Sequence, residues 1–221
     1  MSKRKKRNKS IKSPFRFVLL IIVVGLVFHL MKEYKIKPLK LKTYRNIIDL
    51  RRTQKNYAET VEDLALEFDL PAPYLNALIA LECSGRIDFE PRFESHVFQA
   101  LQDVRDGKIR RYGSITKKHI GDASDDALRN LATSWGPFQL MGYQCIPLDI
   151  KVQDIRGENN IYWGIFWINK SYGRLLKKGE FSDCFHIHNT GKRIPEDGKH
   201  LTHNKTYVER GLDYMQYFNE N

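Results

Sequence analysis

The feature that most constrains this chain is an apolar run near the N-terminus. The run suits a membrane, whereas the longer part of the chain that follows it suits water. Residues 17–31 read FVLLIIVVGLVFHLM, and residues 1–16 carry eight Lys or Arg and no acid. A basic block followed by such a run is typical of an export signal or a membrane anchor. The next residues, KEYKIKPLK, offer no small-residue cleavage site, so we expect the run to be retained as an anchor.

The length of this run leaves one alternative, a buried helix of a soluble domain. The run is short for a hydrocarbon core of about 30 Å, although Arg16 and Lys32 at its ends can extend its reach by snorkelling. The basic block favours an N-terminus inside and a C-terminus outside the cytoplasmic membrane. The expected parts are a basic cytoplasmic tail (1–16), a transmembrane anchor (17–31), a Lys-rich stalk (32–45) and an extracytoplasmic domain (46–221).

The formal net charge of +11 belongs to the N-terminal parts rather than to the domain. Residues 1–31 contribute +8 and residues 32–45 contribute +5, which leaves −2 for residues 46–221. A domain with this balance is not a nucleic-acid binder by composition. We therefore expect the positive charge to lie beside a membrane.

The domain reads as mainly helical. Its expected helices cover residues 59–68, 73–83, 96–106, 125–132 and 161–178, and residues 43–57 can add a short amphipathic helix. No long alternating strand is visible, and a small hairpin near residues 110–116 is left open. Residues 161–176 are apolar around most of a helix, which predicts a central buried helix. We expect its Trp163 and Trp167 to pack in the core, with stacking on sugar rings as the alternative.

Glu82 stands on the apolar face of one of these helices. Leu75, Leu78 and Ile79 precede it at helical spacing, and the Ser84-Gly85 pair predicts that the helix ends directly after it. Burial and the C-terminal end of the helix dipole are both expected to raise the pKa of Glu82. A carboxyl that keeps its proton near neutral pH suits a general acid, whereas the alternative is a structural Glu paired with an Arg or a backbone donor.

Three further stretches accompany Glu82 in a recognisable order. ECSGRIDFEPRFESHVF begins at Glu82, SWGPFQLMGYQ spans residues 134–144, HNTGK spans residues 188–192, and Tyr207 follows. This order resembles the lysozyme-like peptidoglycan muramidases and lytic transglycosylases, and most of all the N-acetylmuramidase branch. The resemblance covers about residues 57–216, although HNTG replaces the commoner Tyr-Asn-x-Gly.

The resemblance implies a mainly α, α+β lysozyme-like domain that needs no cofactor. It implies a glycosidase on the outer side of a bacterial cytoplasmic membrane, cleaving the β-1,4 bond between N-acetylmuramic acid and N-acetylglucosamine in peptidoglycan. Glu82 matches the general acid of the family. The substrate-binding positions that the resemblance implies are Ser134, Gln139, Met141, Tyr143, Asn189 and Tyr207.

Glycosidases generally use two carboxyl groups, and only one is well placed in this sequence. Glu94 is the leading second candidate, and the alternative is a structural brace that holds Arg92 or a backbone amide. Without a second carboxylate, the 6-hydroxyl of the sugar can attack to give an anhydro product. The sequence therefore leaves hydrolysis and transglycosylation open.

Two other classes of protein compete with this interpretation. His186 and His188 would share one face of a strand, and His200 and His203 are near enough in sequence to complete a metal site. That arrangement would indicate a metallohydrolase, but no carboxylate motif such as H-E-x-x-H accompanies it. The third class is an inactive anchored module that only binds peptidoglycan.

The cysteines indicate neither a zinc cage nor a thioredoxin-type site, because the sequence has no C-x-x-C pair. Cys83, Cys145 and Cys184 leave two readings. Cys145 and Cys184 can form one disulfide in an exported domain, or all three can be buried thiols.

Overall fold

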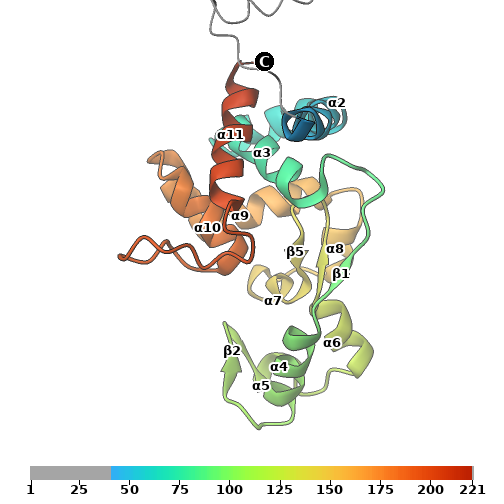
Figure 1. Ribbon diagram of the computed structural model, residues 1–221. Helices are drawn as coiled ribbons and strands as arrows, with labels where there is room; N and C mark the ends of the chain where they lie inside the picture. The colour runs from blue at the N-terminus through green and yellow to red at the C-terminus, as the bar shows by residue number, and fades with distance from the viewer. Residues whose placement is uncertain (1–40, 221) are drawn as a thin grey trace, which may run out of the picture. The chain divides into compact units, whose positions relative to one another are not determined.

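The computed structural model of this chain describes residues 41–220, with side chains from residue 46 onward (Figure 1). The predicted cytoplasmic tail, the predicted transmembrane anchor and most of the predicted stalk lie outside the described residues. Within residues 41–220, no helix combines the length and the hydropathy needed to cross a membrane.

The described part is mostly helical with a few short strands, which confirms the mainly α prediction. The helices are α2 (Leu41–Phe68), α3 (Ala72–Cys83), α4 (Ser95–Arg105), α5 (Lys117–Ile120), α6 (Asp125–Leu131), α7 (Cys145–Leu148), α8 (Val152–Arg156), α9 (Asn160–Lys177), α10 (Phe181–Thr190), α11 (Tyr207–Glu220) and the 3-10 turn η1 (Gly142–Gln144). The strands are β1 (Arg92–Phe93), β2 (Arg111–Tyr112), β3 (Ile115–Thr116), β4 (Thr133–Trp135) and β5 (Leu140–Met141).

The five expected helices are all present, within a few residues of their predicted ends except at the start of α2. The helices expected over residues 43–57 and 59–68 form one continuous helix, α2, because no Gly or Pro separates them. The hairpin that the sequence left open exists as β2 and β3, paired through Arg111↔Thr116 and Tyr112↔Ile115. Helices α10 and α11 are additional elements that the sequence analysis did not predict.

The main core surrounds α3 rather than α9. Eight residues of α3 are buried, from Tyr74 to Cys83, and the helix packs against α2, α9, α10 and α11. Helix α9 buries one face, through Ile165, Ile168 and Leu176, while Tyr162, Trp163 and Phe166 are only half-buried. The expectation that residues 161–176 form the central buried helix was therefore wrong, because the shorter α3 occupies that place.

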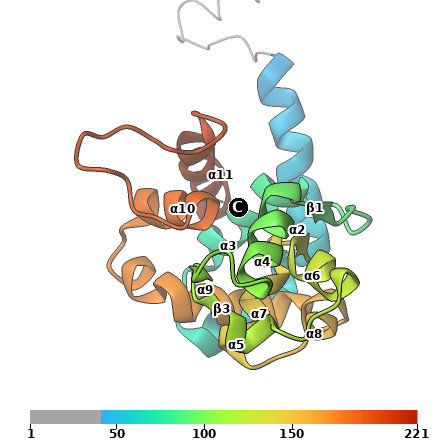
Figure 2. The same cartoon turned by 90° about the horizontal axis from the view of Figure 1, so that it is seen from below.

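A second, smaller core lies under the hairpin. Leu101, Val104, Ile115 and Leu128 pack together from α4, β3 and α6. A three-stranded antiparallel sheet, in the order β1-β4-β5, connects this part with the main core. Figure 1 shows the α4–α6 elements and the hairpin at one end, the sheet in the middle, and α2, α3, α9, α10 and α11 at the other end. Both views also show α10 beside α11 (Figure 2).

The cysteines are buried and free. Cys83 and Cys184 belong to the main core, whereas Cys145 belongs to a third cluster with Leu140 and Ile155. The disulfide considered for Cys145 and Cys184 is therefore absent, and the reading of three buried thiols is confirmed.

Candidate functional site

The end of α3 fixes the position of Glu82. Ser84 and Gly85 both adopt left-handed backbone angles, with φ of 55° and 65°, which stops the helix directly after Cys83. A Cβ atom at Gly85 would overlap the backbone of Thr53 in α2, so only glycine fits this contact. Asn56 of α2 also donates from Nδ2 to the carbonyl of Gly85 at 2.9 Å. Glu82 is thus presented by a helix end that is held firmly against α2.

The carboxylate of Glu82 is mostly buried and is contacted by Tyr207. Its side chain is 14% exposed, in agreement with the inward position that the spacing predicts. The hydroxyl of Tyr207, the first residue of α11, donates a hydrogen bond to Oε1 of Glu82. Burial, and then the nearby negative charge, raise the pKa of Tyr207 well above its ordinary value, so the phenol remains a proton donor.

The other carboxylate oxygen is open. Oε2 of Glu82 has no hydrogen-bond partner among residues 46–220. In this part of the chain, Asn76 Oδ1 is the one fully buried side-chain polar atom without a hydrogen-bond partner. Because Oε2 of Glu82 also has no such partner, it is not fully buried and reaches solvent. The two oxygens therefore differ, since one is held by the protein and the other can meet a ligand.

A row of buried polar groups also reaches Oε1 of Glu82, through His188. Tyr74 donates to the oxygen of Tyr172 at 3.3 Å, and the hydroxyl of Tyr172 lies 2.8 Å from Nδ1 of His188. Nε2 of His188 lies 3.0 Å from the carbonyl oxygen of Phe138 and 4.0 Å from Oε1 of Glu82. A carbonyl only accepts, so Nε2 carries the proton and Nδ1 accepts from Tyr172.

Burial favours the neutral form of His188. Burial lowers the pKa of His188 below its usual value, against the opposing effects of Glu82 and of the Phe138 carbonyl. His188 therefore lies beside the carboxylate as an oriented, uncharged imidazole rather than as the cation of an ion pair. Our sequence analysis did not assign His188 or Tyr172 to the site. The departure of HNTG from Tyr-Asn-x-Gly was the signal that could have indicated His188.

The four histidines of the alternative metal site are not arranged as that alternative requires. His186 and His188 lie on helix α10 instead of a strand, so side chains two residues apart point in different directions. Nε2 of His186 accepts from the amide of Leu201 at 2.9 Å, and its Nδ1 lies 2.7 Å from the carbonyl oxygen of Lys192, so both nitrogens are engaged. No group of three or more His, Cys, Asp or Glu in the described range is arranged to hold a metal ion.

The segment 134–144 builds a tight turn that supports His188. The backbone of Gln139 is left-handed, with a φ of 50°. Its side-chain Oε1 accepts from the hydroxyl of Ser134 at 2.7 Å, and its Nε2 donates to the carbonyl of Gly136 at 3.2 Å. The turn directs the ring of Phe138 onto Gly164 of α9, where a larger residue would overlap it. Ser134 is fully buried, so Ser134 and Gln139 serve the turn that presents the Phe138 carbonyl to His188.

The remaining predicted positions lie in two places. Tyr143 and Met141 pack against the second core, and Tyr143 meets the ring of Tyr112 edge-on at 5.5 Å between centroids. Burial raises the pKa of Tyr143 to about 12. Asn189 is exposed on α10, directly after His188.

Glu94 belongs to the β1–α4 junction. Its Oε1 pairs with Nε of Arg92 at 2.7 Å, and its Oε2 lies 3.7 Å from Nδ1 of His96. After burial, its charge is the second cause that raises the pKa of Tyr112. The contacts of Glu94 in the described part of the chain are those of the brace that the sequence left open, and none of them involves Glu82.

Trp163 and Trp167 are half-buried and take part in the packing of the cores. Trp163 packs against the third cluster, and Trp167 meets the rings of His188 and Tyr172 edge-on at 5.6 and 5.9 Å. These contacts agree with the expected role in packing. Two hollows of about 400 and 350 Å³ lie elsewhere, one beside Arg86 and one beside Tyr162, and neither is lined by Glu82.

The arrangement around Glu82 is chemically suited to proton transfer. A mostly buried carboxyl has one oxygen held by a phenol, a second oxygen open to solvent and a neutral imidazole beside it. Such a group can deliver a proton to a bound molecule and then remain as a hydrogen-bonded carboxylate. Comparisons of the chain with protein-family models, with curated proteins and with solved structures found no match.

Proposed function

We propose that this chain is a peptidoglycan glycosidase with a lysozyme-like domain, anchored by residues 17–31 on the outer side of a bacterial cytoplasmic membrane. The contact between Glu82 and Tyr207 is the observation that carries the proposal. The two residues are 125 positions apart, and the sequence motifs imply both as members of one site. If Glu82 had only a structural role, its second oxygen, Oε2, would not need to be open to solvent.

In the proposed reaction, Glu82 delivers its proton from Oε2 to the glycosidic oxygen as the bond from that oxygen to the anomeric carbon breaks. The phenol of Tyr207 then stabilises the carboxylate that remains, because hydrogen bonds to the charged form favour it. His188 adds an uncharged, fixed neighbour, so the carboxylate is not neutralised by an ion pair.

The second half of the reaction uses the same carboxylate. Glu94 is engaged with Arg92 and His96, so Glu82 is the base that removes the proton from the attacking oxygen. If that oxygen is water, the product has a reducing end. If it is the 6-hydroxyl of the muramic residue, the product is a 1,6-anhydro sugar that is lighter by one water.

The test is the mass of the products released from insoluble peptidoglycan by the full chain in detergent. We expect soluble muropeptides from the wild type and from Glu67→Gln, which changes an exposed carboxyl on α2, and none above background from Glu82→Gln. Equal thermal stability of the three proteins would exclude unfolding as the cause. Release by Glu82→Gln at the wild-type rate would disprove the role of Glu82.

The proposal has one competitor, the inactive module that only binds peptidoglycan. The same experiment separates the two, because such a module would pellet with peptidoglycan and release no muropeptide in any variant. The metallohydrolase has no comparable support, since both nitrogens of His186 are already engaged by backbone groups.

A further inference from the structure

The β2–β3 hairpin and the start of α5 carry a surface patch of one sign of charge. Residues 107–121 contain five Lys or Arg and no acid, although residues 46–221 together have a net charge of −2. The strand register sets Arg111 opposite Thr116, so Arg111 lies near the start of α5, which begins at Lys117. We call this surface the hairpin patch and define it by four exposed residues, Arg110, Arg111, Lys117 and Lys118.

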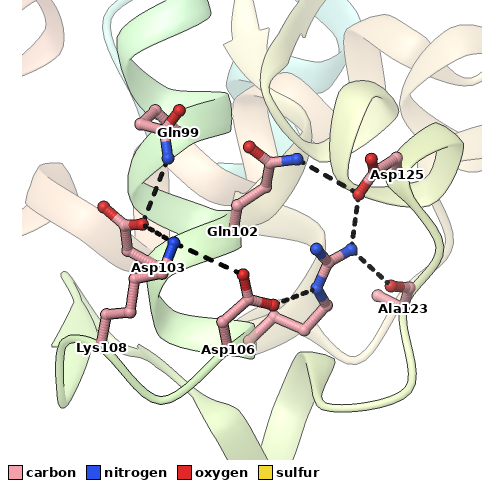
Figure 3. Close-up of polar contacts among 8 residues, drawn as sticks. Gln99, Gln102, Asp103, Asp106, Lys108, Ala123 and Asp125 are labelled. Atoms are coloured by element: carbon pink, nitrogen blue, oxygen red, sulfur yellow. Dashed lines mark hydrogen bonds and ion pairs between the residues drawn. The ribbon is translucent and has the colours of Figure 1, made fainter.

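In the part of the chain whose side chains are described, the cations of the hairpin patch form no ion pair, whereas their neighbours Arg105 and Lys108 do. Arg105 contacts Asp106 at 2.9 Å and Asp125 at 2.6 Å, and Lys108 contacts Asp103 at 3.2 Å (Figure 3). Asp103, Asp106 and Asp125 are therefore already engaged. Within residues 46–220, none of the four patch residues forms an ion pair, so their charge is available to a partner.

The hairpin is also packed against the segment that carries predicted substrate positions. Tyr112 of β2 meets Tyr143 of η1 edge-on, and both rings pack on the second core together with Met141. The hairpin that carries the patch therefore lies next to a segment that the resemblance assigns to the glycan. An anionic group on a bound glycan strand would be attracted to the patch.

We propose that the hairpin patch binds the carboxylates of the peptides carried by the glycan strand, so that the enzyme prefers peptide-bearing strands to peptide-stripped strands. This inference rests on the proposed function. Each muramic residue of uncleaved peptidoglycan can carry a peptide with several free carboxylates, whereas a strand stripped by an amidase keeps only the single lactyl carboxylate of each muramic residue. Four exposed cations on flexible stems suit such a mobile, multiply charged partner, and salt should weaken the attraction.

The first test measures binding without cleavage. The full chain with Glu82→Gln, in detergent, is mixed with intact peptidoglycan and with peptidoglycan stripped of its peptides by an amidase. We expect at least about tenfold tighter binding to the intact material at low salt, and a smaller difference at high salt, as several weak surface contacts predict. Equal binding to both materials would overturn the inference.

A matched pair of variants identifies the surface. The patch variant changes Arg110, Arg111, Lys117 and Lys118 to Gln. The control variant also changes two Arg and two Lys to Gln, at exposed positions on α2 and on or directly after α9, namely Arg51, Lys55, Arg174 and Lys178. The patch variant should lose the preference for intact material, and the control should keep it to within about twofold. An equal loss in both variants would mean that net charge, and not the hairpin patch, attracts the glycan.

The same variants with Glu82 restored separate this inference from the proposed function. The ratio of turnover on intact strands to turnover on stripped strands should fall toward one in the patch variant. If the wild type cleaves neither material, the proposed function fails. If it cleaves both and the ratio is the same in the patch variant, the inference about the hairpin patch alone is wrong.

Discussion

Two polar networks in this molecule are built in opposite ways. The network of Glu82, Tyr207, His188 and Tyr172 is buried or nearly buried, and it joins α3, α9, α10 and α11. The network of Arg105, Asp106 and Asp125 lies at the surface between α4 and α6, with Asp125 63% exposed (Figure 3). The two networks have similar numbers of contacts, so the number of contacts does not indicate which network matters more.

The difference lies in what replaces a lost partner. In the surface network, water and salt can solvate an Asp or Arg that loses its partner, so each ion pair contributes little. In the Glu82 network, a lost partner leaves a polar group buried without a hydrogen bond, which is costly. Mutations should therefore affect the two networks very differently.

The largest effect is expected from Glu82→Gln. It should lower the rate of muropeptide release by about 10²- to 10⁴-fold, because the amide keeps the shape of the carboxyl and cannot deliver a proton. Asp125→Asn makes the same chemical change in the surface network and should leave the rate within about twofold. Similar losses in both variants, measured as initial rates, would remove the distinction between the networks.

The next effect is on stability. Tyr207→Phe should lower the free energy of unfolding by about 1–3 kcal/mol, because Oε1 of Glu82 loses its donor in a mostly buried position. Tyr112→Phe is the control, since its half-buried hydroxyl has no hydrogen-bond partner among the described residues. Urea denaturation of both variants measures the difference, and equal values would show that the Tyr207 contact does not stabilise the fold.

A third prediction concerns pH. The pKa of His188 is lowered in the folded chain, so between that value and the unfolded value of about 6.5 the unfolded chain binds more protons. His188 therefore contributes stability above about pH 6.5 that is lost as the pH falls toward the folded pKa, with a slope of at most about 1.4 kcal/mol per pH unit.

Urea denaturation between pH 5 and pH 7 tests this sign. His188→Gln should flatten the decline in stability, and His203→Gln, which changes an exposed histidine, should not. A decline that is identical in all three proteins would mean that His188 does not titrate differently on unfolding.

The smallest effect is expected in the surface network. Arg105 lowers the pKa values of Asp106 and Asp125, mainly through hydrogen bonds. Arg105→Gln should move the denaturation midpoint slightly at low salt and not measurably in 1 M salt, because exposed charges are screened. A shift that persists in 1 M salt, as large as that of Tyr207→Phe, would contradict the comparison.

The sequence predicted local structure well where periodicity and stop signals agreed. Helix α3 ends where Ser84 and Gly85 indicate, and Glu82 is mostly buried as its spacing from Leu78 and Ile79 predicts. Helix α10 was missed because FSDCFHIHNT is short and rich in residues that also favour strands, so its periodicity is ambiguous.

The sequence motifs indicated two residues of the candidate site but neither their contact nor the other members, His188 and Tyr172. The motifs indicated both Glu82 and Tyr207, but their hydrogen bond depends on the packing of α11 on α3. The roles of Gln139 and Glu94 could be assigned only from the structure. The sequence does not show whether a side-chain amide or carboxylate contacts a ligand or a neighbouring residue. Their observed partners are Ser134 and Gly136 for Gln139, and Arg92 and His96 for Glu94.

By itself, the sequence determined the helical class, the end of α3 and the inward side of Glu82, since these depend on contacts between residues close in the chain. The tertiary structure alone decided that α3 is central, that Tyr207 holds one oxygen of Glu82, and that His188 is a neutral neighbour of Glu82. Each of these depends on burial and on partners far apart in sequence, and the energy of a polar group is set by those surroundings rather than by its own type.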